Sequence, residues 1–249
     1  MGTCYVYTAD VSILNYGEKY EEYYRLVPKY RREKIDSYKR QEPRLLSLGA
    51  GALLHMALAE RGIDDTKLTV QEGKNGKPAY KDIEWTYNLS HSGTKVMCAL
   101  CDVPVGCDVE WGVDRGTAIE DRIKIAKRFF APGEFEKLRD LFEEKKTASG
   151  FTVQVINEQL ADLFYRYWTL KESVIKATGL GIFMDLSSFE VQVYPDGTLG
   201  WGEPVKPLVN NKLVSNLRTY EIEGYEGYKY SVCVDSEAEY ELEVKNILF

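Results

Sequence analysis

The sequence contains no apolar run long enough to cross a bilayer, for which about 18 to 20 consecutive apolar residues are needed. Its first segment, Met1–Val11, also lacks the basic start, apolar centre and small-residue cleavage site of a secretory signal peptide. These absences argue against a membrane-spanning helix and against export. We therefore expect a cytoplasmic protein that has no membrane partner.

Histidine and cysteine, the usual ligands of zinc, are scarce, with two and five residues respectively. Because five is an odd number and no export signal is evident, a disulfide framework is not expected. Cys98 and Cys101 have CxxC spacing, and Cys107 and His91 lie nearby in sequence, so a zinc site is one interpretation. No second CxxC supports it, and Cys98 stands in an apolar run, where cysteine usually acts as a small hydrophobe. We expect reduced thiols.

An excess of positive charge is also lacking, because 32 Lys and Arg residues face 39 Asp and Glu residues and the net charge is −7. Nucleic-acid binding needs a surplus of Lys and Arg on at least one face. The charge balance therefore argues against a general nucleic-acid binder. With 44% hydrophobic residues among 249, the chain is long enough to bury a substantial core in one large or two smaller domains.

Two stretches of the sequence follow the same plan. In the first, a basic helical segment at Arg31–Arg61 precedes an apolar strand at Lys95–Leu100. In the second, a helical segment at Leu160–Thr178 precedes a strand at Lys229–Val234. The repeated plan predicts an α+β fold of two similar halves, each with a small sheet and a long helix.

The boundary between the halves is expected near Val103–Val105. It gives a first half of residues 1–104 and a second half of residues 105–249, and a ligand is expected to bind in the cleft between them. Within the second half, Lys137–Glu158 is charged and then contains Thr, Ser and Gly without a clear period. We predict a mobile excursion at this segment.

A pair of carboxylates stands in the segment Gly106–Glu110. If the segment is extended, Asp108 and Glu110 point to the same side, because side chains alternate along a strand. Two like charges this close are unfavourable unless a positive group lies between them, and a divalent cation is the usual solution. A solvated strand end is the alternative, so this pattern needs a partner elsewhere in the sequence.

The helix predicted at Leu160–Thr178 offers that partner. Trp168, Glu172, Ile175 and Lys176 group on a side next to the core face, where an ordinary surface helix would carry mostly polar residues. Trp and Ile beside Glu172 and Lys176 indicate a partly buried cleft, although an i,i+4 surface ion pair is the alternative. The residues expected on the core face are Leu160, Leu163, Phe164, Tyr167, Leu170, Val174 and Ala177.

Together, Asp108, Glu110 and Glu172 would supply hard oxygen ligands, a set that suits magnesium bound jointly by protein and substrate phosphates. Lys176 would then neutralise phosphate charge. The segment Asn88–Gly93 adds hydroxyls and one of the two histidines just before a strand, where a phosphate could accept hydrogen bonds. A purely structural role for that histidine is the alternative.

Two motifs in combination resemble the surfactin-type family of 4′-phosphopantetheinyl transferases. They are GxDxE at Gly106–Glu110 and WxxKExxxK at Trp168–Lys176, which together are far more specific than either alone. The resemblance implies a fold of two similar α+β halves related by a pseudo-two-fold axis, with coenzyme A bound between them. Other segments that match the family, in order along most of the chain, are Arg31–Lys34, Gly76–Pro78, Asn88–Gly93 and Lys127–Phe130.

The resemblance also implies roles for individual residues. Asp108, Glu110 and Glu172 would hold magnesium against the pyrophosphate of coenzyme A, and Lys176 would contact the phosphates. The sequence departs from the family at Leu46, where a basic residue often stands. The residues that match positions holding the adenosine and its ribose phosphate are Arg31, Lys34, Ser47, Lys77, Ser90 and His91.

The reaction implied is attack by a serine of an apo acyl or peptidyl carrier protein on the phosphorus that bears the pantetheine arm, with release of adenosine 3′,5′-bisphosphate. Such carriers serve nonribosomal peptide, polyketide or fatty acid synthesis. Glu172 is the candidate to accept the serine proton, directly or through water, and Lys176 stabilises the phosphates. A single chain that supplies both walls of the cleft predicts a monomer.

The carrier is expected to dock on Trp111–Arg128, just after the carboxylate motif, where Arg115, Arg122, Ile123 and Lys124 offer basic and apolar groups. Two other functions are compatible with the same residues. One is a magnesium-dependent nucleotide pyrophosphate hydrolase, in which water is the nucleophile. The other is a non-catalytic module that binds coenzyme A, although the presence of all three carboxylates counts against it.

Overall fold

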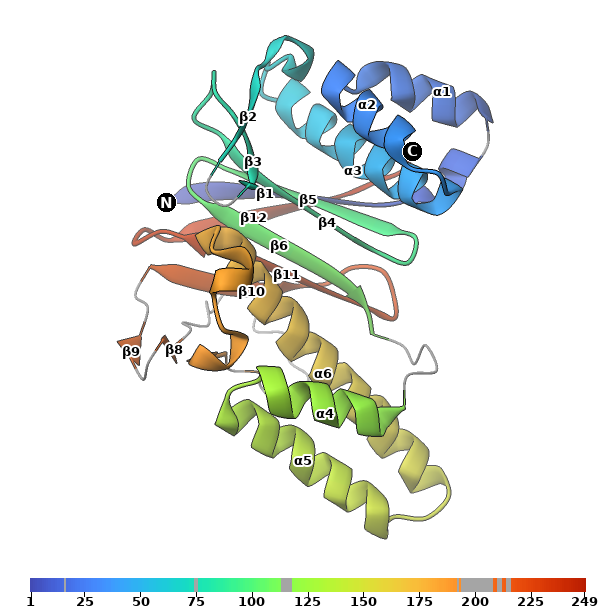
Figure 1. Cartoon of the computed structure of the whole chain (residues 1–249), viewed down its shortest axis with the longest axis vertical. Coiled ribbons are helices and arrows are strands. Elements are labelled where there is room, and N and C mark those ends of the chain that lie inside the picture. The colour runs from blue at the N-terminus through green and yellow to red at the C-terminus, as the bar shows by residue number, and fades with distance from the viewer. Residues whose placement is uncertain are drawn as a thin grey trace.

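The computed structural model of the chain describes residues 1–15, 17–73, 76–112, 118–191, 193, 208–209, 212–213 and 216–249. Figure 1 shows its main elements in layers, with helices, a sheet, a second sheet and further helices following one another along the long axis. This α+β architecture confirms the predicted fold class. None of the helices in the described ranges is both long and apolar enough to span a bilayer.

The first sheet has the strand order β12-β1-β5-β4. The strand predicted at Lys95–Leu100 is confirmed as β5 (Lys95–Cys101), which is buried along its whole length. β12 (Tyr240–Ile247) pairs in parallel with β1 (Gly2–Asp10), while β5 pairs antiparallel with β1 and with β4 (Thr86–Ser92). The last strand of the chain therefore lies in the sheet built mainly by the predicted first half.

Helices α1 (Gly17–Leu26), α2 (Lys29–Ser37) and α3 (Gln41–Ala59) pack against the first sheet through a core that includes Ile35 and Leu53. The single helical segment predicted at Arg31–Arg61 is thus wrong in one respect, because it is two helices. Pro43 lies in the first turn of α3. Proline has no N–H and clashes with the preceding turn of a helix, so the helix must restart just before it.

The second sheet has the order β10-β11-β6. The strand predicted at Lys229–Val234 is confirmed as β11 (Tyr228–Asp235), which pairs antiparallel with β10 (Leu217–Ile222) and with β6 (Val105–Trp111). Side chains such as Val6, Met97, Val109 and Val232 form a core that includes residues of both sheets. This shared core explains why the sheets pack as neighbouring layers.

Helix α6 (Phe151–Thr178) covers the second sheet, and its predicted core face is confirmed: Leu160, Phe164, Tyr167, Leu170, Val174 and Ala177 are buried, with Leu163 partly buried. The mobile excursion predicted at Lys137–Glu158 is wrong. Pro132 begins α5 (Pro132–Thr147), and α6 begins at Phe151. Leu138 of α5 is buried in a core that also contains residues of α4 (Ile119–Phe129) and α6, and Ile156 of α6 is buried as well, which gives these segments a fixed place.

Shorter elements complete the described chain. The strand pair β2 and β3 precedes β4, and the strand group β7-β8-β9 follows α6. Their bounds are Val70–Glu72 for β2, Pro78–Tyr80 for β3, Phe189–Glu190 for β7, Leu208–Val209 for β8 and Lys212–Leu213 for β9, and 3₁₀ turns occur at Val11–Asn15, Asp65–Lys67, Gly181–Phe183 and Leu186–Ser188. All five cysteines are buried and none forms a disulfide.

Candidate active site

The two carboxylates of the GxDxE motif lie on strand β6, on the face that α6 covers. A Cβ atom built on Gly106 would lie only 2.1 Å from the carbonyl oxygen of Ser173 in α6. Only glycine therefore allows the strand and the helix to approach this closely. Asp108 and Glu110 follow at alternate positions, so the predicted extended geometry brings both carboxylates to the helix side.

Helix α6 brings Glu172 and Lys176 to the same place. A pocket of about 370 Å³ gathers residues from β4, β6 and α6. The predicted cleft-facing side of the helix is therefore confirmed for Trp168, Glu172 and Lys176, and Trp168 is held in place by stacking on Phe164 with ring centroids 6.0 Å apart. The pocket is lined by Leu89, Ser90, His91, Asp108, Glu110, Trp168, Glu172 and Lys176.

The charges in this pocket act strongly on one another. Nζ of Lys176 lies 2.5 Å from Oδ1 of Asp108 and 3.3 Å from Oγ of Ser90. Burial raises the pKa of Glu172, and Asp108 and Glu110 add to this effect while Lys176 opposes it. Burial disfavours the charged form of Lys176, but the neighbouring Asp108 outweighs it and raises the lysine's pKa. The pocket thus holds three carboxylates that repel one another and one ammonium that offsets them.

The donor set of this pocket fits magnesium. Oδ2 of Asp108 is buried and has no hydrogen-bond partner among the described residues, which leaves a carboxylate oxygen available as a ligand. The other candidate donors, Glu110 and Glu172, are also carboxylates, and Mg²⁺ prefers oxygen ligands. As the described side chains stand, no three His, Cys, Asp or Glu residues already enclose a metal position. Lys176 lies against Asp108 instead.

Ser90 and His91 follow each other on β4 and point to opposite sides. The hydroxyl of Ser90 donates to Oδ1 of Asp108 at 2.7 Å, so it already contacts a predicted metal ligand. His91 is exposed, and desolvation of its ring together with the positive charges of Lys176 and Lys34 lowers its pKa. A neutral imidazole at the rim of the pocket can donate or accept a hydrogen bond.

The remaining residues predicted to hold the adenosine end lie outside the lining of this pocket. Arg31, on α2, is buried beside Gly51 of α3, with its guanidinium 5.6 Å from the centre of the Tyr30 ring. Ser47, on α3, is buried and its Oγ has no partner among the described residues. Burial, followed by the charge of Arg31, lowers the pKa of Lys34. All three groups lie on α2 and α3, and the charge of Lys34 acts on His91 at the rim of the pocket.

Lys77 contacts the backbone of both elements that carry the carboxylates. Its Nζ donates to the carbonyl oxygens of Val105 at 2.7 Å and of Lys176 at 2.8 Å. Burial lowers the pKa of Lys77 to about 8. The side chain therefore joins the loop before β3 to the start of β6 and to the end of α6, the two elements that carry the carboxylates.

Sequence reasoning missed Lys171, the lysine next to Glu172. Lys171 and Glu134 form an ion pair of 2.8 Å in which both side chains are completely buried. Lys171 also donates to the carbonyls of Leu186 and Phe189, and Glu134 accepts from the N–H groups of Ala131 and Val191. The available signal for the burial of Lys171 was its position in the helix, directly after Leu170 of the core face.

The stretch predicted to dock the carrier, Trp111–Arg128, is only partly described, and Arg115 lies outside the described residues. Arg122 was expected at the surface, but it is only 1% exposed and its guanidinium lies 5.5 Å from the centre of the Tyr165 ring. Arg122 lies three residues after Ile119 and four before Ala126, both buried, so it falls on the same buried face of α4. Ile123 is half-buried and Lys124 is exposed.

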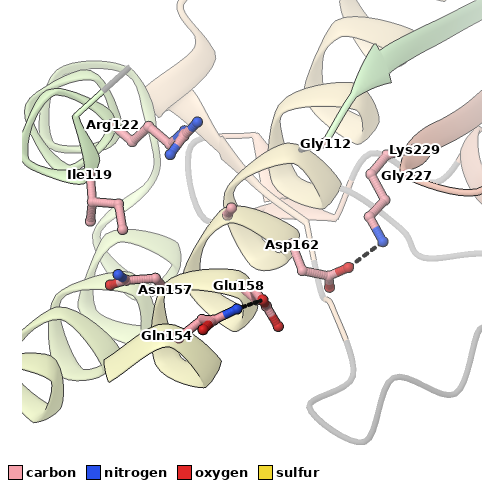
Figure 2. Close-up of a pocket in the computed structure, with 10 residues that line it drawn as sticks. Gly112, Ile119, Arg122, Gln154, Asn157, Glu158, Asp162, Gly227 and Lys229 are labelled. Carbon is pink, nitrogen blue, oxygen red and sulfur yellow. Dashed lines mark hydrogen bonds and ion pairs between the residues drawn. The ribbon is translucent and has the colours of Figure 1, made fainter. Parts of the chain in front are cut away.

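Beside this stretch, a pocket of about 520 Å³ lies between α4, α6 and the ends of β6 and β11. Figure 2 shows its lining, in which Lys229 of β11 forms an ion pair with Asp162 of α6, and Gln154 donates to Glu158. Lys229 stands directly opposite Glu110 in the pairing of β11 with β6. The pocket therefore lies next to the end of β6 that carries the carboxylates.

Comparison with known proteins agrees with this geometry. A family model described as the 4′-phosphopantetheinyl transferase superfamily matches residues 104–233. The chain is 28% identical over 218 residues to the 4′-phosphopantetheinyl transferase Sfp of Bacillus subtilis (strain 168), covering 87% of this chain and 85% of that protein. It is 33% identical over 207 residues to another 4′-phosphopantetheinyl transferase of Bacillus subtilis, covering 82% and 80% of the two chains.

A third relative is the 4′-phosphopantetheinyl transferase HetI of Nostoc sp. (strain PCC 7120), 32% identical over 157 residues, which cover 61% of this chain and 58% of that protein. The residues that the family model matches include both motifs that build the pocket, GxDxE at Gly106–Glu110 and WxxKExxxK at Trp168–Lys176. The chain is therefore a transferase enzyme that belongs to the 4′-phosphopantetheinyl transferase superfamily.

Proposed function

We propose that this enzyme transfers the 4′-phosphopantetheine group of coenzyme A to a serine of an apo acyl or peptidyl carrier protein, with magnesium as cofactor, and releases adenosine 3′,5′-bisphosphate. The observation that carries this proposal is the pocket in which Asp108, Glu110 and Glu172 come together with Lys176. Three carboxylates and a lysine are the groups needed to hold a divalent cation beside phosphates.

Asp108, through its unpartnered Oδ2, and the carboxylates of Glu110 and Glu172 would hold the magnesium ion. When bound there, magnesium polarises a phosphoryl oxygen and stabilises the charge on the leaving phosphate. Lys176, which lies against Asp108, is close enough to the same pocket to exchange that contact for a phosphate oxygen of coenzyme A. Ser90 holds Asp108 through its hydroxyl while this exchange takes place.

In the transfer step, the serine oxygen of the carrier forms a bond to the phosphorus that bears the pantetheine arm. The bond between that phosphorus and the oxygen of adenosine 3′,5′-bisphosphate breaks. The serine proton passes to Glu172, directly or through water. Glu172 would accept this proton on the carboxylate oxygen that does not bind the metal.

Arg31, Lys34 and Ser47, with His91 at the rim, are proposed to bind the adenosine end with its ribose phosphate. Arg31 and Lys34 are both positively charged and partly desolvated, which strengthens their attraction for a phosphate. The position of Lys77 between two carbonyls leaves one of its three N–H donors for the same phosphate.

The described pocket draws one wall from β4 of the first half and the other from β6 and α6 of the second half. A single chain therefore supplies both walls, and we propose that the enzyme works as a monomer. Light scattering at working concentration tests this, since an obligate dimer with activity lost on dilution would contradict it.

The reaction is tested by incubating the purified protein with coenzyme A, Mg²⁺ and an apo carrier protein, followed by mass spectrometry of the carrier. A carrier heavier by one phosphopantetheine group, together with adenosine 3′,5′-bisphosphate in solution, is the expected result. Cleavage of coenzyme A without a change in carrier mass would identify a nucleotide pyrophosphate hydrolase. Binding of coenzyme A without either product would identify a binding module.

A further inference from the structure

Strands β4 and β6 lie in different sheets, and polar side chains of β4 connect them. Three backbone N–H groups of β6 donate to side-chain oxygens at every second position of β4. The N–H of Cys107 donates to Oδ1 of Asn88 at 2.9 Å, that of Val109 to Oγ of Ser90 at 3.3 Å, and that of Trp111 to Oγ of Ser92 at 3.2 Å. These three bonds are called the β4–β6 seam below.

The two serines of the seam make a second bond that Asn88 does not make. The hydroxyl of Ser90 donates to Oδ1 of Asp108 at 2.7 Å, and the hydroxyl of Ser92 donates to Oε2 of Glu110 at 2.8 Å. Each hydroxyl thus accepts from one backbone N–H and donates to the carboxylate of the preceding residue. Asn88 faces the N–H that follows Gly106, where no carboxylate is present.

We infer that Ser92 is a positioning residue that holds the Glu110 carboxylate in the orientation needed to bind the metal, an inference that rests on the proposed magnesium-dependent transfer. Ser92 is only 7% exposed, so its hydroxyl is itself fixed by the strand and by the N–H of Trp111. Glu110 stands near the exposed end of β6 and has three rotatable side-chain bonds. A hydrogen bond from a fixed donor reduces the conformational freedom that the glutamate loses on binding metal.

Each serine binds one oxygen of its carboxylate. The hydroxyl of Ser92 binds Oε2 of Glu110, and the hydroxyl of Ser90 binds Oδ1 of Asp108. At Asp108, Nζ of Lys176 also binds Oδ1, and Oδ2 has no partner among the described residues. The repeat therefore fixes the orientation of each carboxylate through one of its two oxygens.

The inference is tested on the full chain by Mn²⁺ titration, followed by electron paramagnetic resonance, with coenzyme A present and no carrier, so that no turnover occurs. Ser92→Ala should weaken Mn²⁺ binding about tenfold or more, the range typical of lost partners behind metal ligands. Ser92→Thr, which keeps the hydroxyl, should bind Mn²⁺ within about twofold of the parent, a change well under 1 kcal/mol. Should Ser92→Ala fail to fold, Ser92→Cys, a weak donor of similar size, replaces it.

Asn88→Ala is the matched control, because it removes a seam bond of the same kind without touching a carboxylate. It should lower the melting temperature as Ser92→Ala does, yet leave Mn²⁺ affinity at the parent value. Equal Mn²⁺ affinity in Ser92→Ala and Asn88→Ala would overturn the positioning role. A parent protein that binds coenzyme A but no Mn²⁺ would overturn the metal site itself and this inference with it.

Discussion

The ammonium nitrogen of Lys176 lies 2.5 Å from Oδ1 of Asp108, and the two side chains come from different elements, α6 and β6. Among the described residues, this ion pair joins the helix directly to the carboxylate motif. It offsets the negative charge of the pocket, which otherwise contains three carboxylates. A cation bound at Oδ2 of Asp108 would repel the ammonium of Lys176 and would favour its move to a phosphate oxygen.

We expect Lys176→Met to weaken binding of coenzyme A and to slow transfer, because the phosphate loses a charge-assisted contact of about 1.5–3 kcal/mol. Methionine keeps the apolar stem, so packing of α6 should change little. Calorimetric titration with coenzyme A, beside a rate measurement, checks both effects. Lys146→Met, at an exposed site on α5, is the control and should match the parent. If Lys176→Met also matches the parent, the lysine has only a structural role.

Unlike Lys176→Met, Glu172→Gln should slow transfer without weakening the binding of coenzyme A. Glutamine keeps the size of the side chain but removes both the charge that a metal needs and the base that accepts a proton. The maximal rate should therefore fall by about 10² to 10⁴, while coenzyme A still binds through the groups of the first half. Stopped assays at saturating Mg²⁺ and coenzyme A give the rate. Glu136→Gln, at an exposed site on α5, should have no effect. A parent-like rate for Glu172→Gln would contradict the assignment.

The carrier is expected to contact the exposed side of α4. Lys124 is exposed and contacts Asp121 on the same helix, while Ile123 is half-buried beside it. Replacing both with alanine should raise the Michaelis constant for the carrier about 1.5- to 5-fold, the equivalent of an exposed ion pair. Affinity for coenzyme A should not change. Lys39→Ala, exposed on the first half, is the control. Loss of coenzyme A binding in the α4 variant would refute this docking surface.

Lys171 and Glu134 should matter for stability. Both are completely buried, so removing one partner leaves an uncompensated charge in the core. We expect Lys171→Met to reduce the free energy of unfolding by about 3–5 kcal/mol. The double variant Glu134→Gln with Lys171→Met should recover part of this loss, because neither buried group is then charged. Urea denaturation measures both values. A loss below about 1 kcal/mol for Lys171→Met would show that the pair is dispensable.

Patterns that repeat along the chain predicted much of this structure. The 3.6-residue period of apolar residues from Leu160 to Ala177 gave the core face of α6 and placed Glu172 and Lys176 on the neighbouring side. Alternation along Gly106–Glu110 placed Asp108 and Glu110 together. These predictions succeeded because each depends on the geometry of a single helix or strand, which the sequence specifies locally.

Features that depend on contacts between distant segments were missed. Charged residues at Lys137–Glu158 obscured two helices, because Leu138 and Ile156 are the only fully buried side chains of that segment. The pairing of β12 with β1 joins the two ends of the chain, and no local pattern encodes it. No local pattern encodes the β4–β6 seam either. The sequence predicts Ser92 only as part of a phosphate-binding segment. Its bond to Glu110 depends on how two sheets pack.

The pH dependence of the free energy of unfolding tests how Lys77 packs between the halves. Desolvation by burial lowers the pKa of Lys77 to about 8, whereas in the unfolded chain the pKa has its ordinary, higher value. Between these two values the unfolded state binds more protons than the folded state, so the free energy of unfolding rises with pH. Below about pH 8 the lysine is charged in both states, and the cost of burying that charge is fully present.

We therefore expect the parent to gain stability relative to Lys77→Met as the pH rises from about 7 to about 10. Taking the difference between the two proteins cancels the titration of the tyrosines and cysteines that both contain. Urea denaturation at several pH values in this range measures it, with circular dichroism confirming that the fold persists at each pH. A difference that stays constant would mean that Lys77 keeps its ordinary pKa. The lysine would then lie in solvent and could not join the loop before β3 to β6 and α6.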